Sequence, residues 1–315
     1  MDIKLVLDEL EKCVSGKRDV MYRIIMCIVS GGHVVLEDKP GVGKTTIAKA
    51  VSIVMGLRSN RIQFNSDTMP SDVTGYVTYN KNKGCDEFVP GPIFGANLLL
   101  ADEINRASSK CQAALLEVMQ ERQATVGSVA RPVEDPFSVI ATMNPYISAA
   151  YGVSVLPQSE LDRFSMALSV GYPSDEDEIK LLKARDRSDP LDSLEPVCGI
   201  EDILACRAAI DEVFVAPEIY RYALALAKAT RKHRDIEIGV SPRGVLVMLR
   251  LAKTRACFEG RDYVVPADIA EVFPDVCVHR ISTREQELTV ISEKRFKLLS
   301  QILGDTPAPR FFAER

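Results

Sequence analysis

The segment Pro40–Thr46, with the sequence PGVGKTT, restricts the possible folds of this chain more than any other part of it. It follows the apolar run His33–Leu36, which is typical of a β-strand, and leads into a stretch of helical periodicity that ends near Gly56. A glycine-rich loop between a strand and a helix binds phosphate, because backbone N–H groups and the helix N-terminus point at the anion. The segment therefore predicts a P-loop nucleotide-binding fold.

The residues of this loop have separate expected roles. Its glycines let the backbone curl, Lys44 reaches the β- and γ-phosphates, and the Thr45 hydroxyl is a Mg²⁺ ligand. Asp38 stands where the strict G-x-x-x-x-G-K-[ST] pattern has its first glycine. Asp tolerates a left-handed turn better than most residues, so we expect the loop to persist. The expected nucleotide contacts in the loop are Pro40, Gly41, Val42, Gly43, Lys44, Thr45 and Thr46.

A second strand ends in two adjacent carboxylates. Ala96–Ala101 is an apolar run typical of a strand buried on both faces of a parallel sheet, and Asp102 and Glu103 follow it. Both carboxylates are then expected at the carboxyl edge of the sheet, where open α/β folds bind ligands. Asp102 is placed to hold Mg²⁺, and Glu103 is placed to polarise an attacking water. The pair predicts hydrolysis of the nucleotide as well as binding.

The first half of the chain alternates strand and helix patterns. Arg61–Phe64 and Phe137–Thr142 are further expected strands, and Ser109–Gln123 is an expected helix. This alternation is typical of an α/β core with a parallel sheet flanked by helices, which we assign to residues 1–172. Two stretches, 66–90 and 124–136, break the rhythm and are expected to form hairpin insertions.

From residue 174 onward, strand patterns disappear. We therefore expect a smaller, all-helical C-terminal domain over 173–315, with a linker near 188–199, which contains prolines and short polar residues. The expected helices are 176–185, 201–214, 217–233, 242–259, 266–272 and 283–303.

Composition excludes several classes of function. The net charge of −5 and the pI of about 5.5 argue against a dedicated nucleic-acid binder, which would carry a basic excess. The apolar runs are too short to span a bilayer, and no signal peptide begins the chain. The eight cysteines are scattered without a C-x-x-C pair, which favours buried thiols in a reducing cytoplasm over a metal or disulfide framework.

The carboxylate strand and its surroundings resemble the MoxR family of AAA+ ATPases. The resemblance is carried by ANLLLADEINRA, with GGHVVLEDKPGVGKTT before it and VIATMNP after it. Further segments on both sides of this strand match the family in the same order, and the resemblance covers nearly the whole chain. They are FNSDTMPSDVTG, FVPGPIF, LPQSELDRF, GYPSDEDE, SPRG and PADIAEVFPDVCVHRI. The resemblance implies ATP and Mg²⁺ as cofactors, ATP hydrolysis, and a helical lid domain.

The resemblance also assigns three residues around the γ-phosphate. It implies that Asn144 is the sensor-1 amide, although an Asn-Pro turn would use the same residue. It implies that Arg163 is an arginine finger acting in trans on the neighbouring subunit's nucleotide; a local surface ion pair is the alternative. Arg243 matches the sensor-2 arginine and is expected to touch the phosphates of its own subunit from the lid. A solvated arginine at a helix start is the alternative.

Two further matches are less specific. Val14 and Gly16, in the segment VSGK, match the family's residues near the adenine, where backbone contacts tolerate many sequences. Arg106 matches the family's NRA segment, and the sequence assigns it no role.

An arginine supplied in trans requires a contact between two different faces of neighbouring copies, which closes into a ring. The resemblance implies a hexamer that acts as a chaperone-like motor on protein clients, in maturation, metal-cofactor insertion or complex assembly. It also implies a partner with a von Willebrand factor A-type domain, which we expect to be a separate protein. Two alternatives stay open: a nucleic-acid-translocating AAA+ motor, and a nucleotide-gated scaffold with little turnover. A P-loop small-molecule kinase fits least, because SPRG and the helical half have no place in one.

Overall fold

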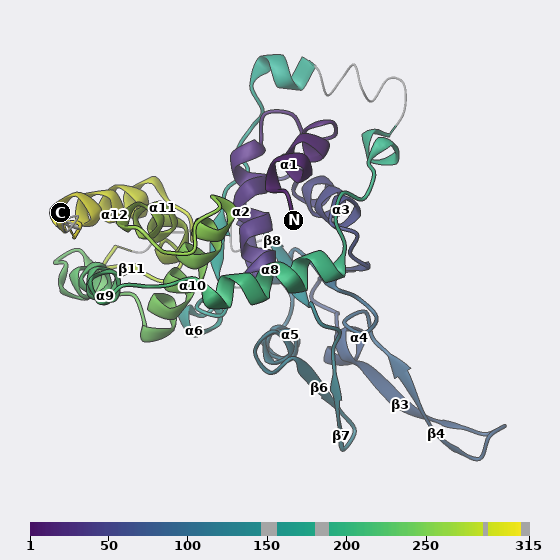
Figure 1. Cartoon of the computed structure of the whole chain (residues 1–315). Helices are drawn as coiled ribbons and strands as arrows, with labels where there is room; N and C mark the ends of the chain where they lie inside the picture. Colours follow the sequence, from purple (N-terminus) through teal and green to yellow (C-terminus); the bar gives the residue numbers. More distant parts are fainter. Residues whose placement is uncertain (146–155, 180–188, 286–288, 310–315) are drawn as a thin grey trace.

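The computed structural model describes residues 1–145, 156–179, 189–285 and 289–309 (Figure 1). Its centre is a parallel five-stranded sheet in the order β2-β5-β8-β1-β9. Every residue of the four strands other than β2 is buried, which is why those segments are almost continuously apolar. The strands are β1 (Val34–Glu37), β2 (Ser59–Gln63), β5 (Leu98–Asp102), β8 (Ser138–Met143) and β9 (Met166–Leu168).

Helices cover this sheet. α2 packs on β1, and α3 packs on β5 and β8, while α1 lies against α2 and α3. α5 begins at an N-cap, Ser108, whose side chain accepts a hydrogen bond from the Cys111 N–H. These helices are α1 (Ile3–Glu11), α2 (Arg18–Val29), α3 (Lys44–Val54) and α5 (Ser109–Glu121). The described part of the chain up to β9 is thus the α/β core that the sequence predicts.

Both predicted insertions are antiparallel hairpins, and they project from the core side by side (Figure 1). β3 and β6 contact each other, and the Arg131 guanidinium lies 4.0 Å from the centre of the Phe88 ring, so the two hairpins pack together. The first hairpin follows a short helix. The elements are α4 (Pro70–Thr74), β3 (Gly75–Asn80), β4 (Cys85–Pro90), β6 (Gln123–Val126) and β7 (Val129–Pro132).

The C-terminal part is built mainly from helices. α8 packs on both α2 and α10, so it connects the core to the helices that follow. Three short elements lie between the larger ones: η1 (Ile104–Arg106) follows β5, α6 (Gln158–Leu161) precedes β9, and η3 (Pro190–Ser193) precedes α8. The helices are α8 (Ile200–Glu212), α9 (Pro217–Lys232), α10 (Pro242–Phe258), α11 (Pro266–Cys277) and α12 (Glu293–Asp305).

Three details of this region differ from the sequence prediction. It is not all-helical, because β10 (Ile236–Ile238) and β11 (Ser282–Thr283) form a small antiparallel sheet. α11 runs past residue 272 to Cys277, with Pro274 inside the helix. Proline has no N–H and removes one hydrogen bond of the helix, but α11 continues beyond it. The helix expected over 283–303 begins only at Glu293, after the N-cap Ser292. The helix expected over 176–185 is present at 175–179, and its remainder lies outside the described residues.

Among the described helices, none combines the length and apolar character that crossing a bilayer requires.

Candidate nucleotide site

Three neighbouring strands end at one edge of the sheet, and each delivers residues of the predicted site. The phosphate loop follows β1, Asp102 and Glu103 follow the body of β5, and Asn144 follows β8, which lies between the other two. In the register, Leu36 of β1 pairs with Thr142 of β8, so the loop and Asn144 leave the sheet at the same level. The parallel topology therefore brings together residues that lie up to about a hundred positions apart.

The loop has the conformation that its glycines allow. Gly41 and Gly43 have φ values of 86° and 91°, in the left-handed region that side chains disfavour, and Gly43 is the N-cap of α3. Lys44, the first residue of α3, donates hydrogen bonds to the Asp38 carbonyl and, at 3.1 Å, to the Lys39 carbonyl. Burial lowers the pKa of Lys44. The ammonium group thus lies inside the curl of the loop, where phosphates bind in P-loop proteins.

The Asp102 carboxylate accepts hydrogen bonds from three side chains. Its Oδ2 accepts from the Thr45 hydroxyl at 3.3 Å and from Arg61 Nη2 at 2.7 Å, and its Oδ1 accepts from the Thr142 hydroxyl. A carboxylate beside a hydroxyl is the all-oxygen set that suits Mg²⁺, so Thr45 and Asp102 fit the predicted ion. The sequence did not indicate Arg61 or Thr142, because both contacts cross between strands and depend on the register.

Glu103 is held by two side chains of the site. Its backbone has φ 56° and its N–H donates to the Thr142 hydroxyl at 3.0 Å. The carboxylate accepts from Asn144 Nδ2 at 3.1 Å and pairs with Arg106 Nη1 at 2.7 Å. The other end of the Asn144 amide, Oδ1, accepts from Lys44 Nζ at 2.9 Å. Asn144 therefore bridges the lysine and the glutamate, and Arg106, to which the sequence gave no role, is a direct partner of Glu103.

Asp38 fixes the start of the loop in a way the sequence did not suggest. It does not adopt the left-handed conformation for which aspartate was expected to be tolerated. Its Oδ2 instead accepts from the Ser169 hydroxyl at 2.7 Å and the Gly171 N–H at 2.6 Å, just after β9. Burial would raise the pKa of Asp38, but these hydrogen bonds outweigh it and lower the pKa. The carboxylate thus ties the phosphate loop to the segment that leaves the sheet.

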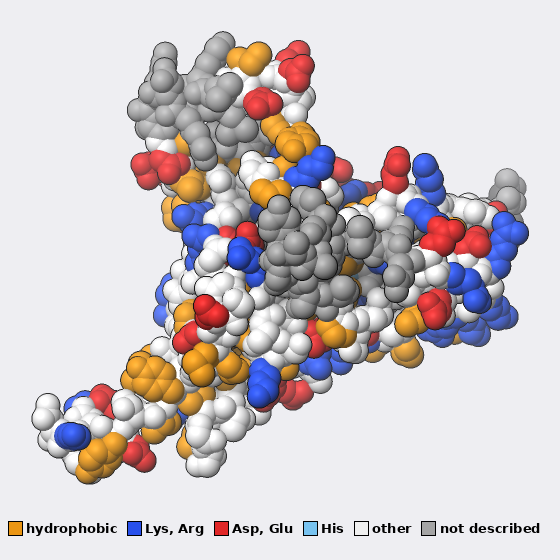
Figure 2. All heavy atoms as spheres, turned by 180° about the vertical axis from the view of Figure 1, so that it is seen from behind, with side chains coloured by type: hydrophobic (Ala, Val, Ile, Leu, Met, Phe, Trp, Pro, Cys, Tyr) orange, Lys and Arg blue, Asp and Glu red, His pale blue; other side chains and the backbone are white. Residues whose placement is uncertain are grey.

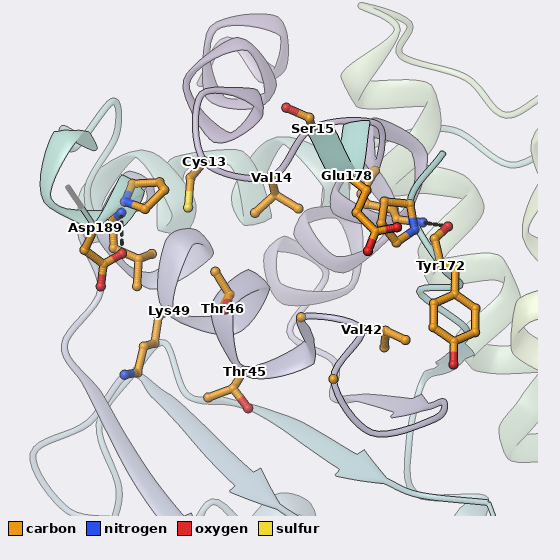
Figure 3. Close-up of a pocket in the computed structure, with 16 residues that line it drawn as sticks. Cys13, Val14, Ser15, Val42, Thr45, Thr46, Lys49, Tyr172, Glu178 and Asp189 are labelled. Atoms are coloured by element: carbon orange, nitrogen blue, oxygen red, sulfur yellow. Dashed lines mark hydrogen bonds between the residues drawn. The ribbon is translucent and has the colours of Figure 1, made fainter. Parts of the chain in front are cut away.

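A cavity of about 420 Å³ opens beside the loop (Figure 3). Val14, from the turn after α1, faces Thr46 of α3 across it. The expected proximity of Val14 to the adenine stays a prediction. Gly16 is not among the lining residues; its φ of 72° lies in the left-handed region, which favours glycine. The sequence missed the rest of the wall, which comes from the segment after β9 and from the expected linker: Tyr172, Pro173, Glu178, Asp189, Pro190 and Leu191.

The two remaining predicted arginines lie together, away from this cavity. Arg163 Nη1 donates to Gln120 Oε1 at 2.8 Å and to the Leu116 carbonyl at 3.1 Å, on α5. Arg243 Nη2 lies 3.4 Å from the same Gln120 oxygen. The sequence suggested that Arg243 touches the phosphates of its own subunit, near Lys44. The structure instead places Arg243 beside Gln120, together with Arg163. The lid docks so that Arg243 lies on the side of the molecule that carries Arg163.

Comparison with known proteins supports this geometry. Residues 33–166 match the ATPase family associated with various cellular activities (AAA), and residues 228–296 match the AAA lid domain. The chain is 40% identical over 275 residues to the uncharacterized protein YeaC of Bacillus subtilis, covering 87% of this chain and 85% of the relative. It is 36% identical over 282 residues to Chaperone MoxR1 of Mycobacterium tuberculosis, covering 87% and 74%. The chain belongs to the MoxR family of AAA+ ATPases.

A solved structure agrees with the assignment to the MoxR family. The crystal structure of a candidate ATPase from Cytophaga hutchinsonii superposes with a TM-score of 0.87 at 35% identity, covering 98% of this chain and 95% of the other. The fold is therefore an AAA domain with a helical lid, as the sequence predicted. As a MoxR-family ATPase, the protein binds nucleotide and hydrolyses ATP.

Proposed function

We propose that the protein is a ring-forming, chaperone-like motor whose ATP lies at the contact between two subunits. The observation that carries this proposal is the separation of the charged groups. Lys44, Glu103 and Asn144 form one cluster at the sheet edge, whereas Arg163 and Arg243 share Gln120 elsewhere on the same chain. The arginines beside the first cluster, Arg61 and Arg106, are already paired with Asp102 and Glu103. In this proposal a second copy therefore supplies the arginine that acts on the γ-phosphate.

In this proposal, one subunit supplies the loop and the base. Lys44 binds the phosphates, Thr45 and Asp102 hold Mg²⁺, and Glu103 polarises the attacking water while Asn144 orients it. The bound Mg²⁺ supplies charge neutralisation on the phosphate oxygens. The neighbouring subunit supplies Arg163 and Arg243, so the proposed sensor-2 contact is made in trans and not in cis. Such a head-to-tail contact closes into a ring, for which we propose six copies.

In this proposal, the two hairpins transmit the motion of the motor to a protein client. They project together from the core and carry exposed apolar side chains at their surface, visible at the lower left of Figure 2. Tyr76 is 51% exposed and Tyr79 is 61% exposed, so neither ring is packed into the core of the chain. Exposed apolar side chains that gather in one place often mark a binding surface. Other exposed apolar residues there are Met69, Val77 and Val129. We propose that this surface contacts a protein client.

The biological setting follows from the family. We propose that the motor works in the cytoplasm with a separate von Willebrand factor A-type protein, in maturation, metal-cofactor insertion or assembly of a complex. A relative is named Chaperone MoxR1, which supports a chaperone-like role.

A mixing experiment tests the shared site. Arg163→Ala protein keeps its own Glu103, and Glu103→Gln protein keeps its own Arg163, so mixed rings contain some interfaces with a complete site. We expect each variant alone to have lost turnover by roughly 10³-fold, and the mixture to exceed both. Retained full activity of Arg163→Ala protein, or inactive variants that show no gain on mixing, would refute the trans arginine.

A further inference from the structure

Asp162 joins the two parts of the molecule at the point where they carry the proposed trans arginines. It directly precedes Arg163 in the core. Its Oδ1 accepts a hydrogen bond from Arg280 Nε of the lid at 2.8 Å. Both of its carboxylate oxygens also lie within reach of the Ser241 hydroxyl, at 2.9 and 3.1 Å. The carboxylate is therefore engaged on one side by α10 and on the other by the turn after α11.

Arg280 fixes the backbone on which Arg163 is carried. It is 2% exposed, and its Nη1 and Nη2 groups donate to the Val276 carbonyl of α11 and to three carbonyl oxygens of the segment that contains Arg163. The distances are 3.0 Å to the Asp162 carbonyl, 2.5 Å to the Phe164 carbonyl and 3.1 Å to the Ser165 carbonyl. A planar guanidinium that satisfies several acceptors at once holds a loop in one conformation. Because the Asp162 carboxylate is the anionic partner of Arg280 in this group, it balances a charge that would otherwise be buried unpaired.

Ser241 fixes the helix on which Arg243 is carried. It is the N-cap of α10, and its hydroxyl accepts from the Gly244 N–H at 3.1 Å while donating to Asp162. Arg243 lies in the first turn of that helix. One carboxylate thus contacts the cap of the helix that carries Arg243 and the arginine that clamps the loop of Arg163.

The two side chains then converge on one atom. Arg163 and Arg243 both contact Gln120 Oε1, although one comes from the core and the other from the lid. The two guanidinium groups carry like charges, so holding both backbones in place favours their close approach. We propose that Asp162 is a positioning residue that locks the lid to the core, so that a single subunit presents Arg163 and Arg243 as one pair to its neighbour. This inference rests on the proposed shared site and adds a residue to it.

A purely architectural role for Asp162 is the competing explanation, and the lid offers a matched control. Asp268 is a fully buried carboxylate that pairs with Arg255 and Arg261 within the lid. It contacts neither proposed trans arginine in the described structure. Asp268→Asn removes a carboxylate charge that pairs with lid arginines, as Asp162→Asn does, and Asp268 is the more buried of the two. It therefore reproduces a general loss of stability without touching the arginine pair.

The test measures steady-state ATPase activity, nucleotide binding and oligomeric state for Asp162→Asn and Asp268→Asn. Misplacing a group by about 1 Å costs up to roughly 100-fold in rate, so we expect Asp162→Asn to lower kcat by about 10- to 100-fold. We expect the affinity for a non-hydrolysable ATP analogue to stay within about 2-fold, because the nucleotide-binding cluster is unchanged. Asp268→Asn should retain most of its kcat at a temperature where both variants are folded.

Mixing Asp162→Asn with Glu103→Gln protein separates the possible failures. We expect activity above either variant alone, because the Glu103→Gln subunit brings a correctly held arginine pair to an intact Glu103. If Arg163→Ala is rescued by Glu103→Gln but Asp162→Asn is not, the positioning role is wrong and the shared site stands. If neither is rescued, the shared site itself fails. An equal loss of kcat in Asp162→Asn and Asp268→Asn would also refute the positioning role.

A second variant covers the case in which Asp162→Asn does not fold. Ser241→Ala removes the link to α10 and leaves the Asp162–Arg280 pair in place. We expect it to lower kcat by several-fold and to be rescued by Glu103→Gln, whereas Ser241→Thr, which keeps the hydroxyl, should behave as wild type. Equal activity of Ser241→Ala and Ser241→Thr would contradict the proposal.

Discussion

The amide of Asn144 contacts the two oppositely charged groups of the nucleotide site: the Lys44 ammonium at 2.9 Å and the Glu103 carboxylate at 3.1 Å. A neutral side chain can serve both, because an amide has an acceptor at one end and donors at the other. Glu103 has a second partner, Arg106. At the scale of residues, the site therefore holds its base in a defined position before any nucleotide binds.

Glu103→Gln is the direct test of this base. We expect kcat for ATP hydrolysis to fall by about 10²- to 10⁴-fold, because glutamine cannot polarise the water as a carboxylate does. Nucleotide binding should persist, since Lys44 and the loop are unchanged, and fluorescent-nucleotide titration measures it. Glu201→Gln, at an exposed position on α8, is the control. Equal turnover of wild type and Glu103→Gln would instead support a nucleotide-gated scaffold.

Sequence reasoning found the residues of this site that belong to contiguous patterns. Lys44 and Thr45 lie in one loop, and Asp102 and Glu103 end one strand, so spacing alone indicates their chemistry. The partners of these residues were not predictable in the same way. Arg61 reaches Asp102 from a neighbouring strand, and that contact depends on a register that no local pattern specifies.

At the scale of elements, the base of the first hairpin requires glycine for steric reasons. A Cβ on Gly91 would lie 2.3 Å from the Val73 carbonyl oxygen, and a Cβ on Gly75 would lie 2.1 Å from the Val89 carbonyl oxygen. The backbones of α4, β3 and β4 therefore approach each other more closely than any side chain allows. Gly75 and Gly91 belong to the segments FNSDTMPSDVTG and FVPGPIF, which resemble the MoxR family. The close approach explains why both positions hold glycine.

We expect Gly91→Ala to lower the free energy of unfolding by about 1–3 kcal/mol, because backbone must move to admit the methyl group. Hydrogen exchange of the β3 and β4 amides should accelerate more than that of the central sheet. Gly304→Ala, where φ is also not positive and a Cβ meets nothing within 4 Å, is the control for adding a methyl group without a clash. Wild-type exchange rates in Gly91→Ala protein would show that the close approach is absent.

The contact between α2 and α11 predicts a pH dependence of stability. Burial raises the pKa of Asp275 to about 6, although Arg23 lies 3.2 Å away and opposes the shift. A raised pKa means that the folded state binds this proton more tightly than the unfolded state does. The contribution of Asp275 to stability is therefore present at low pH and is lost as the pH rises from about 4 to about 6.

Asp275→Asn removes this dependence. We expect its free energy of unfolding, relative to wild type, to increase by on the order of 3 kcal/mol between pH 4 and pH 7. Urea unfolding of both proteins across this range measures the difference. A difference that stays constant with pH would show that Asp275 titrates as an ordinary exposed carboxylate.

The elements themselves were mostly predictable, and the exceptions have a physical cause. Four of the five central strands show their pattern and were predicted to within a few residues, whereas β9, with three residues, was not predicted. Both hairpins were expected, within the insertions 66–90 and 124–136. β10 and β11 have three and two residues, which is too short for any periodicity, so that part of the chain was expected to be wholly helical. The position of Arg243 was missed because it is set by how the lid docks, through contacts distant in sequence.

At the scale of the whole molecule, hydrogen bonds join the lid to the core on the side that carries Arg163. Asp162 and Arg280 join them there, while Glu37, directly before the phosphate loop, accepts from the Val290 and Ile291 N–H groups of the lid at 3.0 and 2.5 Å. Under the proposed shared site, a subunit whose nucleotide cluster and arginine pair lie apart is incomplete alone, so turnover requires assembly.

The most direct test is ATPase activity per chain as a function of protein concentration, with the oligomeric state followed by sedimentation velocity under the same Mg²⁺ and ATP conditions. The account predicts that activity per chain falls as the ring dissociates on dilution, in parallel with the loss of assembled protein. A protein that remains monomeric at every concentration and hydrolyses ATP at an undiminished rate per chain would contradict it.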